Sequence, residues 1–247
     1  MLIKIISGFA LYNILDIIRR ELFLLIIFTK SMIIILLGSQ ASGKGTQGEL
    51  LSKRLKLPTL SIGQLYRDQI SKQTQIGKMV KKYVIKGELA PEEYTEKLLT
   101  LELKKSKYKK GVIFDGFPRN FEQVKFIEKL FNIDVAILID IDRKEVIKRI
   151  IGRLVCQCGE IYNLFSEKSE LPLAGNICKK CKGKLKPRSD DSPKAIKERL
   201  RIYDQETKPI INYFQQHNKL IKINGDQHIN DVFKNIMAKL EERHLLK

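Results

Sequence analysis

The sequence predicts an α/β fold in which helices cover a parallel β-sheet. Two observations predict it: the chain contains short apolar runs rich in Ile, and the first run is followed by a glycine-rich turn and an amphipathic segment. Short apolar runs that end at a turn are typical of strands buried in a parallel sheet. The runs span residues 32–37, 111–115, 135–142 and 220–225.

The stretch LLGSQASGKGTQ, which ends the first run, nearly matches the phosphate-binding pattern of Gly, four residues, Gly, Lys, and Ser or Thr. Gly38, Gly43 and Lys44 occupy the expected positions. Gly45 follows the lysine, however, and the hydroxyl comes one residue later, at Thr46. The motif therefore needs its structural context before it can be accepted.

That context is a strand before the loop and a helix after it. Residues 47–57 carry leucines at mixed three- and four-residue spacings, which predicts an amphipathic helix. Glycines let backbone N–H groups converge on an anion, and the helix N-terminus adds partial positive charge. Lys44 supplies an ammonium that can follow a transferring phosphoryl group. The alternative is a tight glycine turn that binds nothing.

The second run ends in the stretch GVIFDGFPRN, residues 111–120. Ligands of open α/β sheets bind beyond the carboxyl ends of the strands, so this turn should face the glycine-rich loop. Asp115 could hold Mg²⁺ through water, because Mg²⁺ keeps several waters and uses few carboxylates. Gln123, four residues after Arg119, carries an amide that can both donate and accept hydrogen bonds.

Two further stretches are rich in charge: KRIIGRLV follows the third run, and KPRSDDSPKAIKERL precedes the last one. By composition alone both are charged loops. Planar guanidinium groups nevertheless suit bidentate phosphate contact. One set of basic residues from these and the earlier stretches runs along the chain in the order Lys44, Arg67, Arg119, Arg153, Arg188 and Arg199.

The GKGT loop, the GVIFDGFPRN stretch and the ordered arginines together resemble the nucleoside monophosphate kinases, and most closely the adenylate kinases. The displaced hydroxyl is a trait of that family. The resemblance covers residues 32–240 and implies a P-loop fold, with a parallel five-stranded sheet, a monophosphate-binding (NMP-binding) insert and a lid. The chain departs from the family at Gln40 and Ala41, where Pro and Gly are usual. We expect a functional loop of slightly altered shape, because Ala41 is crowded if its position needs a positive φ.

The resemblance also divides the chain into an extension, a core in three parts, and two inserts. Residues 1–31 are the extension, 32–61, 92–152 and 190–247 the core, 62–91 the NMP-binding insert, and 153–189 the lid.

The resemblance implies a role for each residue that matches a family position. The ATP-binding residues are Gly38, Ala41, Ser42, Gly43, Lys44, Gly45, Thr46, Arg153, Ile161, Tyr162 and Gln227. The AMP-binding residues are Ile62, Arg67, Glu88, Leu89, Ala90, Gly116, Phe117, Pro118, Arg119, Gln123, Arg188 and Arg199. The catalytic residues, which act on the transferring phosphoryl group, are Lys44, Arg119, Arg153, Arg188 and Arg199. Asp190 and Asp191 support the lid arginines, and Asp115 holds Mg²⁺ through water.

All four cysteines lie in the lid, as a Cys-x-Cys pair and a Cys-x-x-Cys pair. They are Cys156, Cys158, Cys178 and Cys181. In a cytosolic enzyme this grouping favours a metal over disulfides, and four thiolates can form a closed tetrahedral zinc site. The segment resembles the zinc lids of bacterial adenylate kinases, whose first pair is usually Cys-x-x-Cys. Such a metal would stiffen a lid too small for its own core. Free thiols and a redox pair remain the alternatives.

The implied reaction is reversible transfer of the γ-phosphoryl group of Mg-ATP to AMP, giving two ADP. Ile62 stands where adenylate kinases usually carry Thr, whereas Gln123 favours adenine, so a UMP/CMP kinase is the first alternative. A GTPase would need a guanine-reading Asn-Lys-x-Asp motif, which the sequence lacks. A zinc-ribbon nucleic-acid binder would explain the cysteines and the charge but not the ordered arginines.

The formal net charge of the 247 residues is 46 − 28 = +18, which raises nucleic acid as a partner. Apart from the cluster at 179–186 the lysines are scattered, and an enzyme that grips several phosphates needs a positive cleft in any case. We therefore expect nucleotide substrates, no nucleic-acid partner, and a cytoplasmic monomer.

Residues 1–31 contain two apolar runs of 11 and 8 residues that are split by charged side chains. Neither run reaches the ~20 apolar residues of a spanning helix, and the segment lacks a good signal-peptide cleavage site. We expect this segment to be translated from an upstream start, with the core beginning at Met32 and no stable membrane association. An amphipathic anchor on a membrane surface is the alternative.

Overall fold

The computed structural model describes residues 31–167 and 170–246. The expectation for the N-terminal extension therefore concerns residues that lie almost entirely outside the described part. Within that part no helix is both long and apolar enough to cross a membrane.

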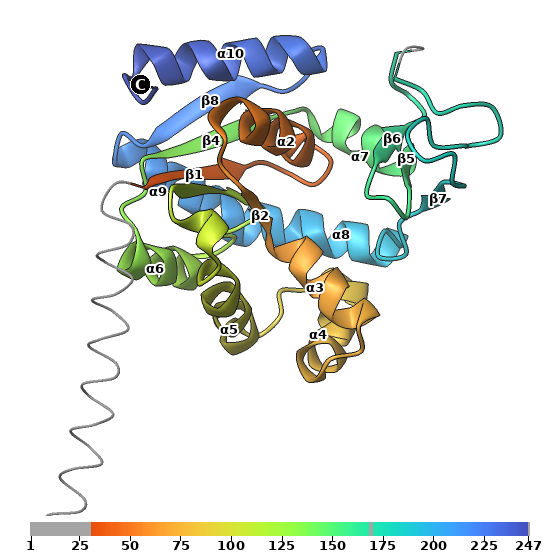
Figure 1. The fold of residues 1–247 in the computed structure, drawn as a ribbon, viewed down its shortest axis with the longest axis horizontal. Coiled ribbons are helices and arrows are strands. Elements are labelled where there is room, and N and C mark those ends of the chain that lie inside the picture. The colour runs from red at the N-terminus through yellow and green to blue at the C-terminus, as the bar shows by residue number, and fades with distance from the viewer. Residues whose placement is uncertain (1–30, 168–169, 247) are drawn as a thin grey trace, which may run out of the picture.

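A five-stranded, fully parallel sheet forms the centre of the molecule, in the order β2-β3-β1-β4-β8 (Figure 1). Its strands are β1 (Met32–Leu37), β2 (Thr59–Ser61), β3 (Gly111–Asp115), β4 (Val135–Asp140) and β8 (Leu220–Asn224). The four predicted strands are confirmed, although the third ends at Asp140 and not at Asp142, and the fourth ends at Asn224 and not at Gly225. Asp142 instead caps the following helix, because its carboxylate accepts a hydrogen bond from the Lys144 N–H at 2.7 Å.

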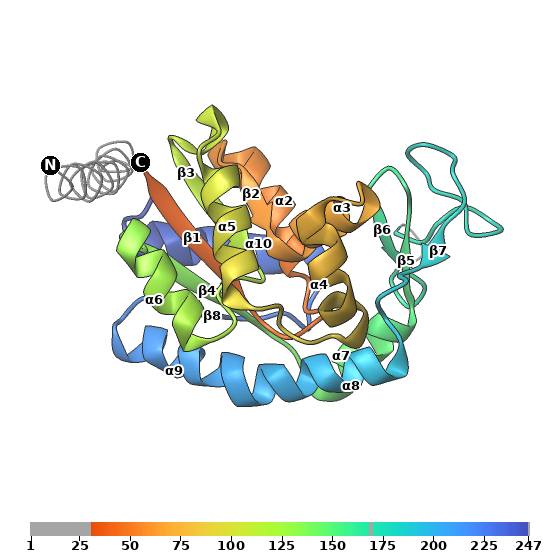
Figure 2. The ribbon, with the colours of Figure 1, turned by 90° about the horizontal axis from the view of Figure 1, so that it is seen from below.

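Alternate residues of each central strand enter two different cores, which is why these runs are apolar throughout. In β1, Ile33 and Ile35 belong to the core beneath α5, α6 and α9, whereas Ile34 and Leu36 belong to the core beneath α2 and α10. Figures 1 and 2 show these two helix layers on opposite faces of the sheet. Because β1 and β3 pair in parallel, their carboxyl ends lie at the same edge of the sheet, where the site is found.

The helices alternate with the strands as a parallel sheet requires. They are α2 (Lys44–Leu55), α3 (Ile62–Ser71), α4 (Gln75–Lys86), α5 (Glu92–Leu103), α6 (Phe121–Leu130), α7 (Arg143–Ile151), α8 (Pro193–Ile202), α9 (Lys208–Gln216) and α10 (Ile229–Glu242). A 3₁₀ turn, η1 (Ser106–Tyr108), precedes β3, and a π-helical segment, η2 (Tyr203–Thr207), joins α8 to α9. The helix predicted at 47–57 is confirmed as α2, which begins earlier, at Lys44, and ends at Leu55.

Two parts of the chain extend from this core (Figure 1). Helices α3 and α4 form one, at the position of the expected NMP-binding insert. The other is a small antiparallel sheet in the order β6-β5-β7, which lies beyond α7 at the position of the expected lid. Its strands are β5 (Arg153–Val155), β6 (Ile161–Asn163) and β7 (Lys186–Pro187).

Candidate active site

The glycine-rich loop runs from the end of β1 to the start of α2, as the motif requires. Gly38 has a φ of 144°, and a side-chain carbon built there would lie 2.5 Å from the carbonyl oxygen of Ile139. Gly43, with a φ of 98°, is the N-cap of α2. The turn is therefore closed by backbone geometry that most side chains would disturb.

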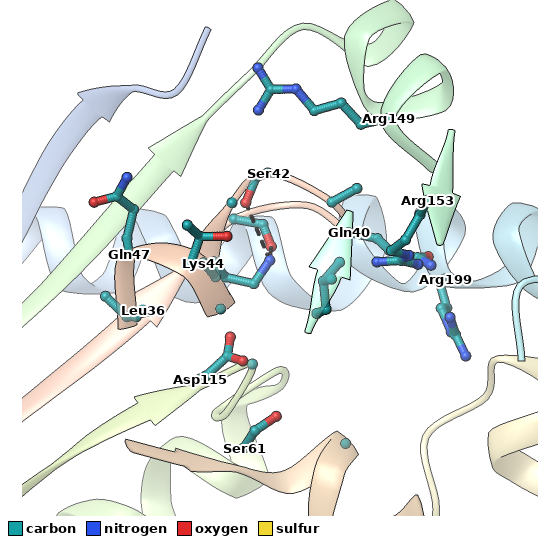
Figure 3. A pocket seen from close by; sticks show the side chains of 18 of the residues that line it. Leu36, Gln40, Ser42, Lys44, Gln47, Ser61, Asp115, Arg149, Arg153 and Arg199 are labelled. Carbon is teal, nitrogen blue, oxygen red and sulfur yellow. Dashed lines mark hydrogen bonds between the residues drawn. The ribbon is translucent and has the colours of Figure 1, made fainter. Parts of the chain in front are cut away.

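Lys44 folds back over this loop (Figure 3). Its ammonium donates hydrogen bonds to the carbonyl oxygens of Gly38 and Ser39, at 2.8 and 2.5 Å, and lies 3.3 Å from Ser42 Oγ. Burial lowers the pKa of Lys44 to about 8, while the nearby Asp115 acts in the opposite direction. The lysine is thus a charge held inside the loop, close to where a phosphate would enter.

Ala41 adopts a left-handed conformation with a φ of 59°, the conformation in which a side chain is crowded. Its methyl group packs against the apolar cluster formed by Val146, Ile150 and Leu200. This packing offsets part of the cost of a positive φ in a residue other than glycine. Apolar contacts therefore help the loop to hold an alanine at this position.

Asp190 contacts arginines from α3, from the loop after β7 and from α8. Arg188 donates two hydrogen bonds to its carboxylate, at 2.9 and 2.5 Å, and Arg199 of α8 donates one at 2.8 Å. Arg67 of α3 lies 3.9 Å from the same carboxylate. The Asp190 side chain is only 7% exposed, so these contacts are shielded from water.

Asp191 links the lid to α8 in a similar way. Arg153 of β5 donates to its Oδ2 at 2.9 and 2.5 Å, and Arg199 donates to its Oδ1 at 3.0 Å. Gln40 of the glycine-rich loop also donates to Oδ1, at 2.8 Å. The two adjacent aspartates therefore hold arginines from the lid and from α8 in one cluster.

The pKa values of these side chains are shifted because several charged groups are buried close together. Burial lowers the pKa of Arg67 to about 10, and neighbouring Arg188 contributes to the shift. Burial also lowers the pKa of Arg119 and Arg153. Burial opposes ionisation of Asp190, but hydrogen bonds and charge from Arg188, helped by Arg199, hold the pKa of that carboxyl well below its usual range. The site is an excess of buried positive charge that suits a polyanion.

Gln123 lies near the start of α6 and is 4% exposed. Its Oε1 accepts a hydrogen bond from the Arg119 N–H at 2.8 Å, and its Nε2 donates to the Glu92 carboxylate at 3.1 and 3.2 Å. Because a carboxylate only accepts and a backbone N–H only donates, these contacts fix which way the amide points. Arg119 is also held, by a 2.8 Å hydrogen bond from its Nε to the Gly116 carbonyl.

One cavity of about 690 Å³ connects these groups. Its lining includes every residue predicted to bind ATP, and every residue predicted to bind AMP except Phe117. Phe117 is fully buried in the core beneath α5 and α6, so its side chain does not face the cavity. Asp115 and Asp190 line the cavity, whereas Asp191 stands behind it.

Several lining residues were given no role by the sequence. Arg149 of α7 donates to Glu145 at 2.8 Å and to the Gly225 carbonyl at 3.2 Å. His228, whose Nδ1 caps α10, has its Nε2 3.5 Å from Glu170 of the lid loop. The occurrence of Arg149 in the same basic stretch as Arg153 was a usable signal. No sequence pattern indicates that Glu170 of the lid loop lies beside His228, which follows the last strand.

The four cysteines converge although the first pair is spaced by only one residue. Their sulfur atoms all lie within 4.8 Å of one another, and none is in a disulfide. The Cys156–Cys181 and Cys158–Cys178 sulfur distances are 3.3 and 3.7 Å. Four thiolates around one zinc, at Zn–S of about 2.3 Å, are separated by about 3.8 Å. The donor set and its spacing fit a tetrahedral zinc ion.

Comparison with known proteins agrees with this geometry. The family model described as adenylate kinase matches residues 36–219. An adenylate kinase of Thermoanaerobacter sp. (strain X514) is 36% identical over 218 residues, which cover 86% of this chain and 99% of that relative. One from Archaeoglobus fulgidus is 36% identical over 217 residues, covering 85% of this chain and 99% of that relative.

This chain belongs to the adenylate kinase family. The membership confirms the predicted α/β P-loop fold and the predicted class of enzyme, a phosphotransferase that acts on nucleotides. A GTPase switch and a zinc-ribbon nucleic-acid binder were considered from the sequence. Neither accounts for a family match that extends across most of the chain.

Proposed function

We propose that this chain transfers the γ-phosphoryl group of Mg-ATP reversibly to AMP. The observation that carries the proposal is the single cavity that joins the glycine-rich loop to the amide of Gln123, with cationic side chains between the two ends. Those side chains are Lys44, Arg67, Arg119, Arg153, Arg188 and Arg199. A donor phosphate at the loop and an acceptor base near Gln123 would place both phosphates among these cations.

The chain's residues act by alignment and by stabilising spread negative charge. Backbone N–H groups of the loop and the N-terminus of α2 bind the donor phosphates. The Lys44 ammonium exchanges its carbonyl partners for phosphate oxygens, and Arg153 and Arg199 contact the group in transfer. Arg67 and Arg119 bind the acceptor phosphate. No side chain needs to form a covalent bond to phosphorus.

Asp115 is the residue that would hold Mg²⁺ through water. It ends β3, lines the cavity, and its Oδ2 lies 3.8 Å from the position of a side-chain carbon built on Gly45. A single carboxylate facing a phosphate loop fits an ion that keeps most of its waters. When bound, Mg²⁺ neutralises part of the phosphate charge.

Closure of the lid (153–189) and of the insert (62–91) would keep water from the phosphoryl group. His228 of the core and Glu170 of the lid loop already lie close together at the ATP end of the cavity. The adjacent Ile161 and Tyr162 of β6 line the same end. These contacts support a role for the lid in covering the nucleotide.

A panel of nucleoside monophosphates assayed with Mg-ATP tests the proposed acceptor. We expect ADP formation to be fastest with AMP, because the Gln123 amide, oriented by Arg119 and Glu92, has a second N–H and a second oxygen lone pair for a base edge. A preference for UMP or CMP by tenfold or more in kcat/KM would overturn the assignment. Ile62 is the observation that favours this second candidate, since it lines the acceptor end with an apolar side chain.

We also propose that Cys156, Cys158, Cys178 and Cys181 bind one structural Zn²⁺ per chain. The buried members of the set, Cys156 and Cys178, pack with Leu154 and Leu185 in a small cluster separate from the main cores. Metal binding would supply folding free energy that this cluster alone lacks. Elemental analysis of protein purified without chelator should give about one zinc per chain, and Cys178→Ser should lose it. Four thiols that titrate freely in folded, metal-free protein would refute the site.

A further inference from the structure

The strongest unassigned feature of the site is the contact between Gln40 and Asp191. Gln40 belongs to the glycine-rich loop, at a position where the family usually has Pro, which carries no side-chain donor. Its Nε2 donates a 2.8 Å hydrogen bond to Asp191 Oδ1. The contact joins the donor-phosphate loop to a residue 151 positions away along the chain.

Asp191 is itself the anchor of two arginines. Its Oδ2 is held by Arg153 and its Oδ1 is shared by Arg199 and Gln40. The side chains of Asp191 and Arg153 are 7% and 10% exposed, so their positions are set by these contacts more than by water. A displacement of Asp191 would therefore be passed to both guanidinium groups.

We propose that Gln40 is a positioning residue for phosphoryl transfer. Through Asp191 it sets the guanidinium groups of Arg153 and Arg199 relative to the loop that holds the donor phosphates. Figure 3 shows Gln40 beside these two arginines, at the side of the loop that faces the lid. The inference rests on the proposed phosphoryl transfer and adds to it a loop residue whose side chain acts through Asp191.

Gln40 contributes little to folding by comparison. Its Oε1 is buried and has no hydrogen-bond partner among the described residues. An unsatisfied buried acceptor is unfavourable, so it offsets the stabilisation that the Asp191 contact provides. Removing the amide should therefore change activity more than it changes thermal stability.

The test compares steady-state kinetics and melting temperatures of Gln40→Ala and Gln40→Met with those of the unmodified chain. Gln40→Met keeps the length of the side chain but removes its donor. We expect kcat to fall about tenfold in both variants, equivalent to about 1.4 kcal/mol of transition-state stabilisation. KM for ATP should stay within about twofold, because the loop backbone is retained. Gln215→Ala, an exposed glutamine of α9, is the matched control and should leave kcat unchanged.

A double-mutant cycle separates action through Asp191 from a general effect on the loop. In an Asp191→Ala background, Gln40→Ala should change kcat by less than about twofold. If Gln40→Ala lowers kcat tenfold both in the unmodified chain and in the Asp191→Ala background, Gln40 acts on the loop alone and the proposal is wrong. The proposal is also wrong if both Gln40 single variants keep kcat within twofold of the unmodified chain. Failure of the unmodified chain to form ADP from Mg-ATP with any monophosphate would refute the proposed function instead.

Discussion

Replacing Asp190 by Asn removes the counter-charge of the arginine cluster while keeping the size of the side chain. Three charge-assisted hydrogen bonds reach this carboxylate, two from Arg188 and one from Arg199, and Arg67 lies 3.9 Å away. The Asn amide can accept at one oxygen only, and its NH₂ group would face guanidinium donors. Each such hydrogen bond contributes roughly 1.5–3 kcal/mol, and removing one partner of a buried ion pair costs about 3–5 kcal/mol.

We therefore expect Asp190→Asn to lower the free energy of unfolding of the ligand-free protein by about 3 kcal/mol or more. For a chain of this size that corresponds to a melting temperature lower by roughly 6–12 °C. Urea unfolding and calorimetry measure the change. Glu122→Gln, in an exposed pair with Lys125, is the control and should shift stability by less than about 1 kcal/mol.

The pH dependence gives an independent check. Because the arginines depress the folded-state pKa of Asp190, its contribution is present above the unfolded pKa of about 3.9 and is lost as the pH falls toward the folded value. The stability difference between Asp190→Asn and the unmodified chain should therefore shrink below about pH 4. A difference under 1 kcal/mol at pH 7 would show that water, and not Asp190, balances these arginines.

The remaining predictions concern the loop. Lys44→Met should reduce kcat by at least a hundredfold, because it removes a positive charge that stabilises the transition state. Circular dichroism should show that the variant is still folded. Near-normal turnover would refute the assignment of the loop. Burial lowers the pKa of ligand-free Lys44 to about 8, so ATP binding should weaken as the pH rises above 8. Binding at those pH values should be accompanied by proton uptake, which calorimetry in buffers of different ionisation enthalpy measures. An ATP affinity that stays constant up to pH 9.5 would contradict this prediction. Ala41→Gly should change the melting temperature by no more than about 3 °C, because relief of the positive φ is offset by the lost methyl packing, worth about 0.8 kcal/mol. Gly43→Ala also strains the backbone, but a methyl group there has nothing within 4 Å to pack against, so it should destabilise the protein more than Ala41→Gly does.

The sequence by itself determined the elements whose signal is local. The run at 32–37 and the run at 111–115 became β1 and β3 with those same bounds, because burial on both faces demands an unbroken apolar stretch. The phosphate-binding loop was predictable because its signal is also local. Its glycines, its lysine and the flanking strand and helix all lie within about twenty residues. The edge strand β2 was not readable, because its three residues are stabilised by pairing with β3 and carry no apolar run of their own.

Only the tertiary structure decided how distant charges pair. The sequence placed Asp190 and Asp191 beside the lid arginines, but it could not show that one carboxylate gathers Arg67, Arg188 and Arg199 while the other also reaches Gln40. Such contacts depend on how the loop, the lid and α8 meet around one cavity, which no short-range pattern encodes. The convergence of two unequally spaced cysteine pairs has the same origin, because it needs the two turns that carry them, each closed by backbone hydrogen bonds, to meet in space.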